Sequence, residues 1–227
     1  MKELGQAISR SSLLLAAFAA LTALVVAGTF LGTQERIRAA ERAAEEKALL
    51  EIMPRSRHDN QMLEDRIDLP VNDPHLRLPN PRSLYVARQA GVVQAVLVPA
   101  VAPDGYSGAI ELLVGVNRNG SLAGVRVLKH RETPGLGDAV DHKKSNWIEG
   151  FRGKSLGDPP VDRWTVRRDG GDFDQFTGAT ITPRAVVRAT ARVLAYVDEN
   201  RGRLFGEKAT AAPEIVAAVA KQEVTGE

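Results

Sequence analysis

Two threonines, Thr177 and Thr180, flank the small pair Gly178–Ala179 directly before a predicted helix. Thr182 is expected to be the N-cap of that helix, because its hydroxyl can accept a hydrogen bond from an unpaired amide of the first turn. Pro183 suits the first helical position, where no amide donor is needed. The unpaired amides and the helix macrodipole favour a phosphate at this end. An ordinary capped helix is the alternative, and on these residues alone it is the more common case.

A second segment that could form part of a ligand site is ETPGLG, residues 132–137, which follows a predicted strand. Thr133 is expected to be extended because it precedes Pro134, and the Pro134-Gly135 pair favours a type II turn. Gly135 and Gly137 leave the backbone bare, so that a flat ligand could approach it closely. The alternative is a plain turn between a strand and a helix.

The composition limits the chemistry that the chain can perform alone. It has no cysteine, which excludes disulfides, thiolate metal sites, cysteine-ligated iron–sulfur clusters and cysteine nucleophiles. The four histidines lack the spacing of a zinc site, so no metal is expected. With 30 Lys and Arg against 28 Asp and Glu, the net charge of +2 gives no case for nucleic-acid binding. Catalytic or redox chemistry must therefore rely on oxygen nucleophiles or a bound cofactor.

The N-terminal part of the chain predicts a transmembrane helix over residues 13–31, after a short segment of residues 1–12. Nineteen helical residues span about 28 Å, close to the ~30 Å hydrocarbon core of a bilayer. A cleaved signal peptide is the alternative, but the apolar run is too long and no small-x-small cleavage site follows it. Basic residues flank the helix on both sides, so the charge pattern leaves the orientation open.

The rest of the chain predicts one compact α+β domain on a stalk. Residues 34–53 are rich in helix formers and precede Pro54, and the proline-rich residues 54–82 indicate an extended connector. The stalk helix and connector thus cover 34–82, the domain covers 83–205 and a tail covers 206–227.

Within the domain we expect antiparallel strands with flanking helices. The predicted strands are 84–89, 92–101, 109–116 and 122–130, with a hairpin turn at 117–120. A short helix over 138–151, a strand with a glycine turn over 163–172 and a helix over 182–200 follow them.

The stretch from Asp174 to Thr182, DQFTGATIT, resembles the D-x-x-[ST]-G-A-T-x-[ST] motif at which FMN-binding domains of bacterial membrane redox complexes are flavinylated. The N-terminal anchor and the segments GYSGAIELLVGV, ETPGLGD and KSNWIEGF occur in the order found in the G subunit of the Rnf (Rsx) ion-translocating electron-transport complex. The resemblance covers the anchor and nearly all of residues 83–200. One departure is Asn146, where that family often has Asp.

The resemblance implies that Thr180 carries FMN through a phosphodiester bond. The other flavin-site residues that it implies are Thr177, Gly178, Ala179, Thr182, Glu132, Thr133, Gly135, Leu136 and Gly137, with Leu136 packing on the ring. Asp174 would serve either flavin binding or recognition by the transferase. No residue near Thr180 in the sequence could activate its hydroxyl, so attachment would need a separate flavin transferase that uses FAD and Mg²⁺.

The same resemblance implies an electron-relaying subunit that performs no complete reaction alone. Its partners would be other membrane and iron–sulfur subunits, in a complex that couples ferredoxin/NAD electron transfer to ion translocation. The FMN domain would lie on the periplasmic side of the cell inner membrane. Two alternatives remain at this point: the C subunit of a sodium-translocating NADH:quinone reductase, and an unflavinylated membrane-tethered structural or sensory domain.

Overall fold

The computed structural model describes the backbone of residues 2–206 and the side chains of residues 12–40 and 42–206. The predicted tail therefore lies, beyond Gly206, outside the described residues. The chain divides into two compact units, Met1–Glu45 and Glu46–Glu227.

Helix α1 (Lys2–Ile52) runs without a break through the predicted transmembrane segment and the predicted stalk. Its part from Ser12 onward is long and apolar enough to cross a membrane, and the large apolar side chains between Leu13 and Leu31 are exposed. The helix ends two residues before Pro54, as its sequence predicts. The structure thus confirms a helix able to span a bilayer.

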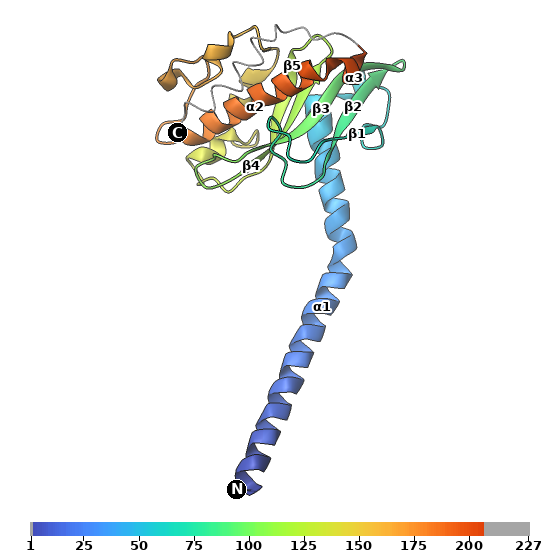
Figure 1. Cartoon of the computed structure of the whole chain (residues 1–227), viewed down its shortest axis with the longest axis vertical. Helices are drawn as coiled ribbons and strands as arrows, with labels where there is room; N and C mark the ends of the chain where they lie inside the picture. Colours follow the sequence, from blue (N-terminus) through green and yellow to red (C-terminus); the bar gives the residue numbers. More distant parts are fainter. Residues whose placement is uncertain (1, 207–227) are drawn as a thin grey trace. The chain divides into compact units, whose positions relative to one another are not determined.

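Five antiparallel strands form one sheet in the order β1-β2-β3-β4-β5 (Figure 1). The four predicted strands are confirmed, and the turn between β4 and β5 has Gly120 at a φ of 84°. The additional strand β1 was not predicted. The strand bounds are β1 (Arg66–Asp68), β2 (Ser83–Gln89), β3 (Val92–Ala102), β4 (Ile110–Asn117) and β5 (Leu122–Lys129).

Both faces of the sheet are buried. On β3, Val96 and Val98 belong to the core shared with helix α2 (Ile181–Glu199), whereas the alternate residues Ala95 and Leu97 pack with the last turn of α1. Burial on both sides explains why these strands read as nearly continuous apolar runs. A further short helix, α3 (Arg201–Phe205), follows α2. The architecture is α+β, as predicted.

The last turn of α1 is part of the second unit, Glu46–Glu227, which is called the compact unit below. Leu49, Ile52 and Met53 are fully buried, and a Cβ added to Gly115 would lie 2.3 Å from Cγ2 of Ile52. The proline-rich residues 54–82 also contribute to the core, and Leu76 is one of several that do so. The boundary expected at residue 83 therefore lies inside the compact unit, because prolines signal irregular backbone but do not prevent packing.

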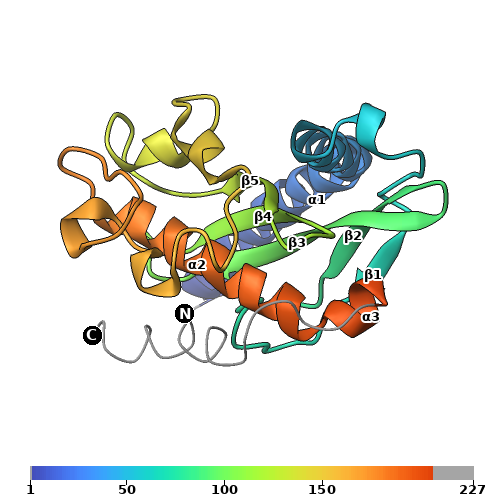
Figure 2. The same ribbon diagram turned by 90° about the horizontal axis from the view of Figure 1, so that it is seen from above.

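Between β5 and α2 the chain forms four short 3-10 helices. The predicted helix over 138–151 is wrong: two separate turns, η2 (Gly137–Val140) and η3 (Trp147–Phe151), occupy it. The remaining two are η4 (Val161–Arg163) and η5 (Arg167–Asp169). Figure 2 shows this segment, yellow to orange, gathered beside the first turns of α2.

The predicted strand over 163–172 is also wrong. The segment makes a single isolated bridge, from Val166 to Phe173, and pairs with no strand of the sheet. Instead, the backbone turns back on itself, so that the amide of Phe173 donates to the carbonyl of Thr165. The Trp164 and Phe173 rings pack 5.0 Å apart, and this buried aromatic pair stabilises the loop in place of a ladder of strand hydrogen bonds.

Candidate functional site

A cavity of about 390 Å³ brings together the two segments that the sequence singled out. Eight of the eleven predicted site residues line it, together with three residues that were not predicted. The lining is Tyr106, Glu132, Thr133, Leu136, Gly137, Arg168, Gly178, Ala179, Thr180, Ile181 and Thr182.

The first wall of the cavity is the turn at Thr133–Leu136. The amide of Leu136 donates to the carbonyl of Thr133 at 3.1 Å, and Gly135 has a φ of 79°, as a type II turn requires at its third position. The amide of Gly135 also donates to Oδ1 of Asp138 at 2.7 Å. This side-chain bond fixes the turn from inside, so Leu136 is presented to the cavity from a defined backbone.

A buried hydrogen bond joins the two segments. The hydroxyl of Thr182 donates to Oε2 of Glu132 at 2.5 Å, and the backbone amide of Ser107 donates to Oε1 at 3.0 Å. Glu132 and Thr182 are both buried, so this carboxylate has protein partners on both oxygens. The Glu132 carboxylate therefore holds three chain segments together at the cavity.

The prediction that Thr182 is the N-cap of the helix is wrong. Helix α2 begins at Ile181 and Thr180 occupies the N-cap position. Thr182 is the second residue of the helix and Pro183 the third, so the expectation that Pro183 is the first is wrong as well. The physical reason is the long-range bond to Glu132, which takes the hydroxyl that a local cap would have used.

Gly137 lies where the turn passes the Glu132–Thr182 bond. A Cβ added to it would lie 2.6 Å from Oε2 of Glu132 and 2.7 Å from the hydroxyl oxygen of Thr182. A side chain of any size would push these two groups, so the close approach depends on glycine here.

The second wall is the turn Phe176–Ala179, in which the amide of Ala179 donates to the carbonyl of Phe176 at 3.1 Å. Gly178 has a φ of 79°, and a Cβ on it would lie 3.6 Å from Cδ2 of Leu136. The two walls thus approach each other closely at Leu136 and Gly178.

Trp147 supports this second wall from behind. Its indole Nε1 donates to the carbonyl of Asp174 at 2.8 Å, and its ring meets Phe176 edge-on with centroids 5.2 Å apart. The loop that carries the threonine motif is therefore held from the protein side by an aromatic contact and a hydrogen bond.

Thr180 lies at the start of α2 with its hydroxyl available. Its side chain makes no capping hydrogen bond, while its carbonyl accepts from the amide of Arg184 at 3.3 Å. The first amides of an α-helix have no acceptor within the helix. An oxygen nucleophile and unpaired amide donors thus meet at one end of the cavity, which suits a phosphate ester.

Three predicted residues do not line the cavity. Thr177 is exposed in the turn beside Gly178, and Gly135 supports the first wall without facing the space. Asp174 is exposed and forms an ion pair with Arg167, 2.9 Å from Nη1 to Oδ1.

Three lining residues were missed by the sequence analysis: Tyr106, Arg168 and Ile181. Tyr106 is 70% exposed and Ile181 is 41% exposed, so both present apolar surface at the cavity, as does Leu136 at 44%. The sequence held a signal for Tyr106, because it is an aromatic residue between glycines in a loop. Nothing distinguished Arg168 from its neighbour Arg167.

An ion pair holds η5 next to the start of α2. Asp169 accepts two hydrogen bonds from the Arg184 guanidinium, at 2.5 Å from Nε and 3.0 Å from Nη2. This bidentate contact holds the pKa of the Asp169 carboxyl below its usual value of 3.8, against the opposing effect of burial.

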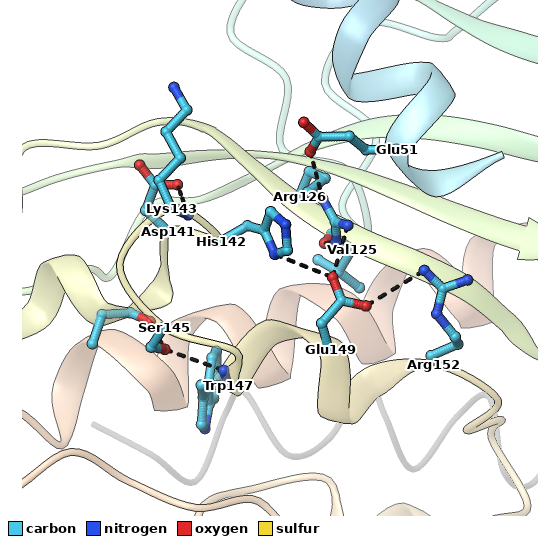
Figure 3. Close-up of polar contacts among 11 residues, drawn as sticks. Glu51, Val125, Arg126, Asp141, His142, Lys143, Ser145, Trp147, Glu149 and Arg152 are labelled. Carbon is cyan, nitrogen blue, oxygen red and sulfur yellow. Dashed lines mark hydrogen bonds and ion pairs between the residues drawn. The ribbon is translucent and has the colours of Figure 1, made fainter. Parts of the chain in front are cut away.

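Figure 3 shows a second charged cluster, centred on β5 and η3. None of its residues lines the cavity. Arg126, whose side chain is only 7% exposed, contacts Glu51 of α1 at 2.9 Å and Glu149 of η3 at 2.7 Å. Glu149 also contacts His142 at 3.2 Å and Arg152 at 3.4 Å. The cluster fixes η3, and with it Trp147, to the sheet and to the end of α1.

Comparison with known proteins places this geometry in context. Residues 105–195 match the FMN-binding domain family, and residues 1–52 match the RnfG N-terminal region. All the residues that line the cavity fall within the first of these matches.

The chain is also similar to curated proteins along most of its length. It is 51% identical to the G subunit of the ion-translocating oxidoreductase complex of Pseudomonas aeruginosa (strain UCBPP-PA14) over 206 residues, which cover 90% of this chain and 95% of that protein. Proteins of the same name from Vibrio cholerae (strain O395) and Shewanella baltica are 43% and 42% identical. These matches cover 88% and 86% of this chain, and 95% and 92% of the respective relatives.

Proposed function

The chain belongs to the family of G subunits of ion-translocating oxidoreductase complexes, and from this premise we propose that it carries FMN bound covalently to Thr180. Membership of the family makes it an electron-transfer flavoprotein subunit with an FMN-binding domain. The observation that carries the finer proposal is the position of the Thr180 hydroxyl, without a capping bond, at the cavity end where α2 begins.

The cavity fits FMN in size and in chemistry. Its volume of about 390 Å³ falls within the ~300–1,000 Å³ of typical cofactor pockets. The start of α2 supplies amide donors for a phosphate, and the exposed side chains of Tyr106, Leu136 and Ile181 supply apolar surface for a flat ring.

Thr180 is preferred over the two neighbouring threonines for separate reasons. The hydroxyl of Thr182 is buried and donates to Glu132, so its oxygen is not open to a reagent. Thr177 is exposed but lies outside the cavity lining. Thr180 alone of the three combines a hydroxyl without a capping bond with a place in the cavity.

The proposed roles of the chain's own residues follow from their contacts. Glu132 holds the turn of residues 133–136 against α2, and Leu136 closes the space over Gly178. Once bound, FMN supplies the one- or two-electron redox chemistry that the protein side chains lack. A covalent bond would keep the cofactor in a site whose rim is open to solvent.

Attachment would form a bond between the Thr180 oxygen and the FMN phosphorus of FAD. The phosphoanhydride bond of FAD breaks, AMP leaves and the hydroxyl proton is released. We propose that a separate flavin transferase with Mg²⁺ performs this step. We further propose that the partners of the mature subunit include iron–sulfur subunits, and that the FMN domain lies on the periplasmic side of the inner membrane. The C subunit alternative is less well supported, because the relatives described above are G subunits.

The test is peptide mass spectrometry of the chain co-produced with a flavin transferase. We expect one peptide containing Thr180 to gain the mass of FMN less one water. Thr180→Val keeps the β-branched shape and removes the hydroxyl, so this variant should fold and stay colourless. Thr177→Val is the matched control and should retain covalent flavin, at a reduced yield.

Full flavin occupancy in Thr180→Val, or fragment ions that place the adduct on Thr177 or Thr182, would contradict the proposal. A wild-type chain that stays unmodified under these conditions would favour the structural or sensory alternative.

A further inference from the structure

Two adjacent arginines of η5 have different surroundings. Arg167 lies outside the cavity lining and forms an ion pair with Asp174 at 2.9 Å. Arg168 lines the cavity, and its guanidinium has no ion pair with any residue that the structure describes. One of two neighbouring cations is thus neutralised locally, and the other faces the site that contains Thr180.

The position of Arg168 is fixed by its own backbone and by the next residue. Its amide donates to Oε1 of Gln175 at 3.2 Å, in the loop that leads to the threonine motif. Asp169 holds η5 to the first turn of α2 through two bonds to Arg184. These contacts fix the backbone of Arg168 beside the cavity that its side chain lines.

The cavity lining has no carboxylate free to neutralise Arg168. Glu132 is the one acidic residue among the lining residues, and both of its oxygens accept hydrogen bonds inside the protein. The start of α2 adds a positive partial charge on the same side. This end of the cavity therefore has an excess of positive charge, which suits an anion.

We propose that the guanidinium of Arg168 binds the phosphate of the flavin and makes the site selective for FMN over riboflavin. A guanidinium presents paired donors that match two phosphate oxygens, and such charge-assisted bonds are stronger than neutral ones. This inference rests on the proposed function, because it takes the cavity to be the flavin site.

The experiment compares two ligands that differ only in the phosphate. Full-length chain, produced without a transferase and purified in detergent, is titrated with FMN and with riboflavin, and binding is followed by flavin fluorescence anisotropy. We expect FMN to bind about tenfold more tightly than riboflavin, as for a charge-assisted hydrogen bond at a partly exposed site. In Arg168→Gln this ratio should fall towards one, while riboflavin affinity stays unchanged.

Two further variants make the test specific. Arg167→Gln removes the neighbouring charge and should leave the FMN-to-riboflavin ratio unchanged. Arg168→Lys keeps the charge without the paired donors and should retain part of the preference. A merely structural role of Arg168 would change the affinity for both flavins equally and would leave their ratio intact.

An unchanged ratio in Arg168→Gln, or an equal loss in Arg167→Gln, would overturn the assignment of Arg168 and leave the flavin site standing. Failure of the wild-type chain to bind either flavin in this titration, when it still acquires covalent FMN at Thr180 from the transferase, would overturn this inference and leave the proposed function standing. If the wild-type chain binds FMN in this titration but gains no FMN after co-production with the transferase, the role of Thr180 is contradicted and the assignment of Arg168 stands.

Discussion

Replacing Thr182 by Val should destabilise the compact unit by about 1.5–3 kcal/mol, the typical contribution of a hydrogen bond to a charged group. Val preserves the β-branched shape of this fully buried side chain and removes only the hydroxyl. Oε2 of Glu132 then loses its 2.5 Å donor while it stays buried. The loss should therefore come from an unsatisfied carboxylate oxygen and not from a cavity.

The assay is thermal unfolding followed by tryptophan fluorescence. Trp147 and Trp164 both lie in the compact unit, so the signal reports on its unfolding. For a unit of this size, each kcal/mol shifts the midpoint by about 2–4 °C, so a decrease of about 3–12 °C is expected. Thr182→Ser keeps a hydroxyl and should recover most of the loss.

Thr190→Val is the matched control within the same helix. Thr190 is also buried, but its hydroxyl donates to the Val186 carbonyl, which belongs to the helix ladder. Its removal should cost less than about 0.5 kcal/mol. Equal midpoints for Thr182→Val and Thr190→Val would refute the reasoning that the bond to Glu132 stabilises the two cavity walls.

Three more predictions can be checked by measuring the stability of variants. Gly137→Ala should cost about 1–3 kcal/mol, because its Cβ would lie 2.6 Å from Oε2 of Glu132; a neutral effect would contradict the close packing. Arg126→Gln should cost about 2–4 kcal/mol in urea unfolding, because two carboxylates lose their buried partner, whereas Arg152→Gln at the exposed edge of that cluster should cost less than about 1 kcal/mol. Because the folded-state pKa of Asp169 is lowered, its contribution to stability is present above its unfolded value of 3.8 and lost as pH falls through the folded value. The stability difference between wild type and Asp169→Asn should thus be constant above about pH 5 and shrink towards pH 2, and a difference that grew on acidification would contradict this sign.

The parts of the fold that sequence predicted are those with local causes. The strands from β2 to β5 are apolar runs separated by turn residues, and the structure has them within one or two residues of the predicted bounds. The Pro134-Gly135 turn follows from the backbone preferences of these two residues alone. The family resemblance predicted that ETPGLG and the threonine motif lie at one site. The spacing of the two segments in the sequence does not predict this contact.

The parts that sequence missed depend on distant partners. Thr182 satisfies every local rule for an N-cap, yet Glu132, fifty residues away, takes its hydroxyl. The segment 163–172 has β-forming residues, but its one aromatic residue, Trp164, is buried against Phe173 and does not lie on a strand of the sheet. Arg167 and Arg168 are adjacent residues of the same type, so the sequence does not distinguish them. The structure does, because Arg168 lines the cavity and Arg167 pairs with Asp174.

The packing of Leu49, Ile52 and Met53 against the sheet determines where this chain can be shortened. A fragment that begins at residue 83 would lose the last turn of α1 and would expose the apolar face of the sheet to which Leu97 belongs. An exposed apolar face of this kind promotes aggregation. A fragment that begins shortly before Glu46 would omit the membrane-spanning segment and keep that face covered. The final turn of the anchor helix thus covers one face of the FMN-binding domain, and a fragment intended for spectroscopy in detergent-free buffer should retain that turn.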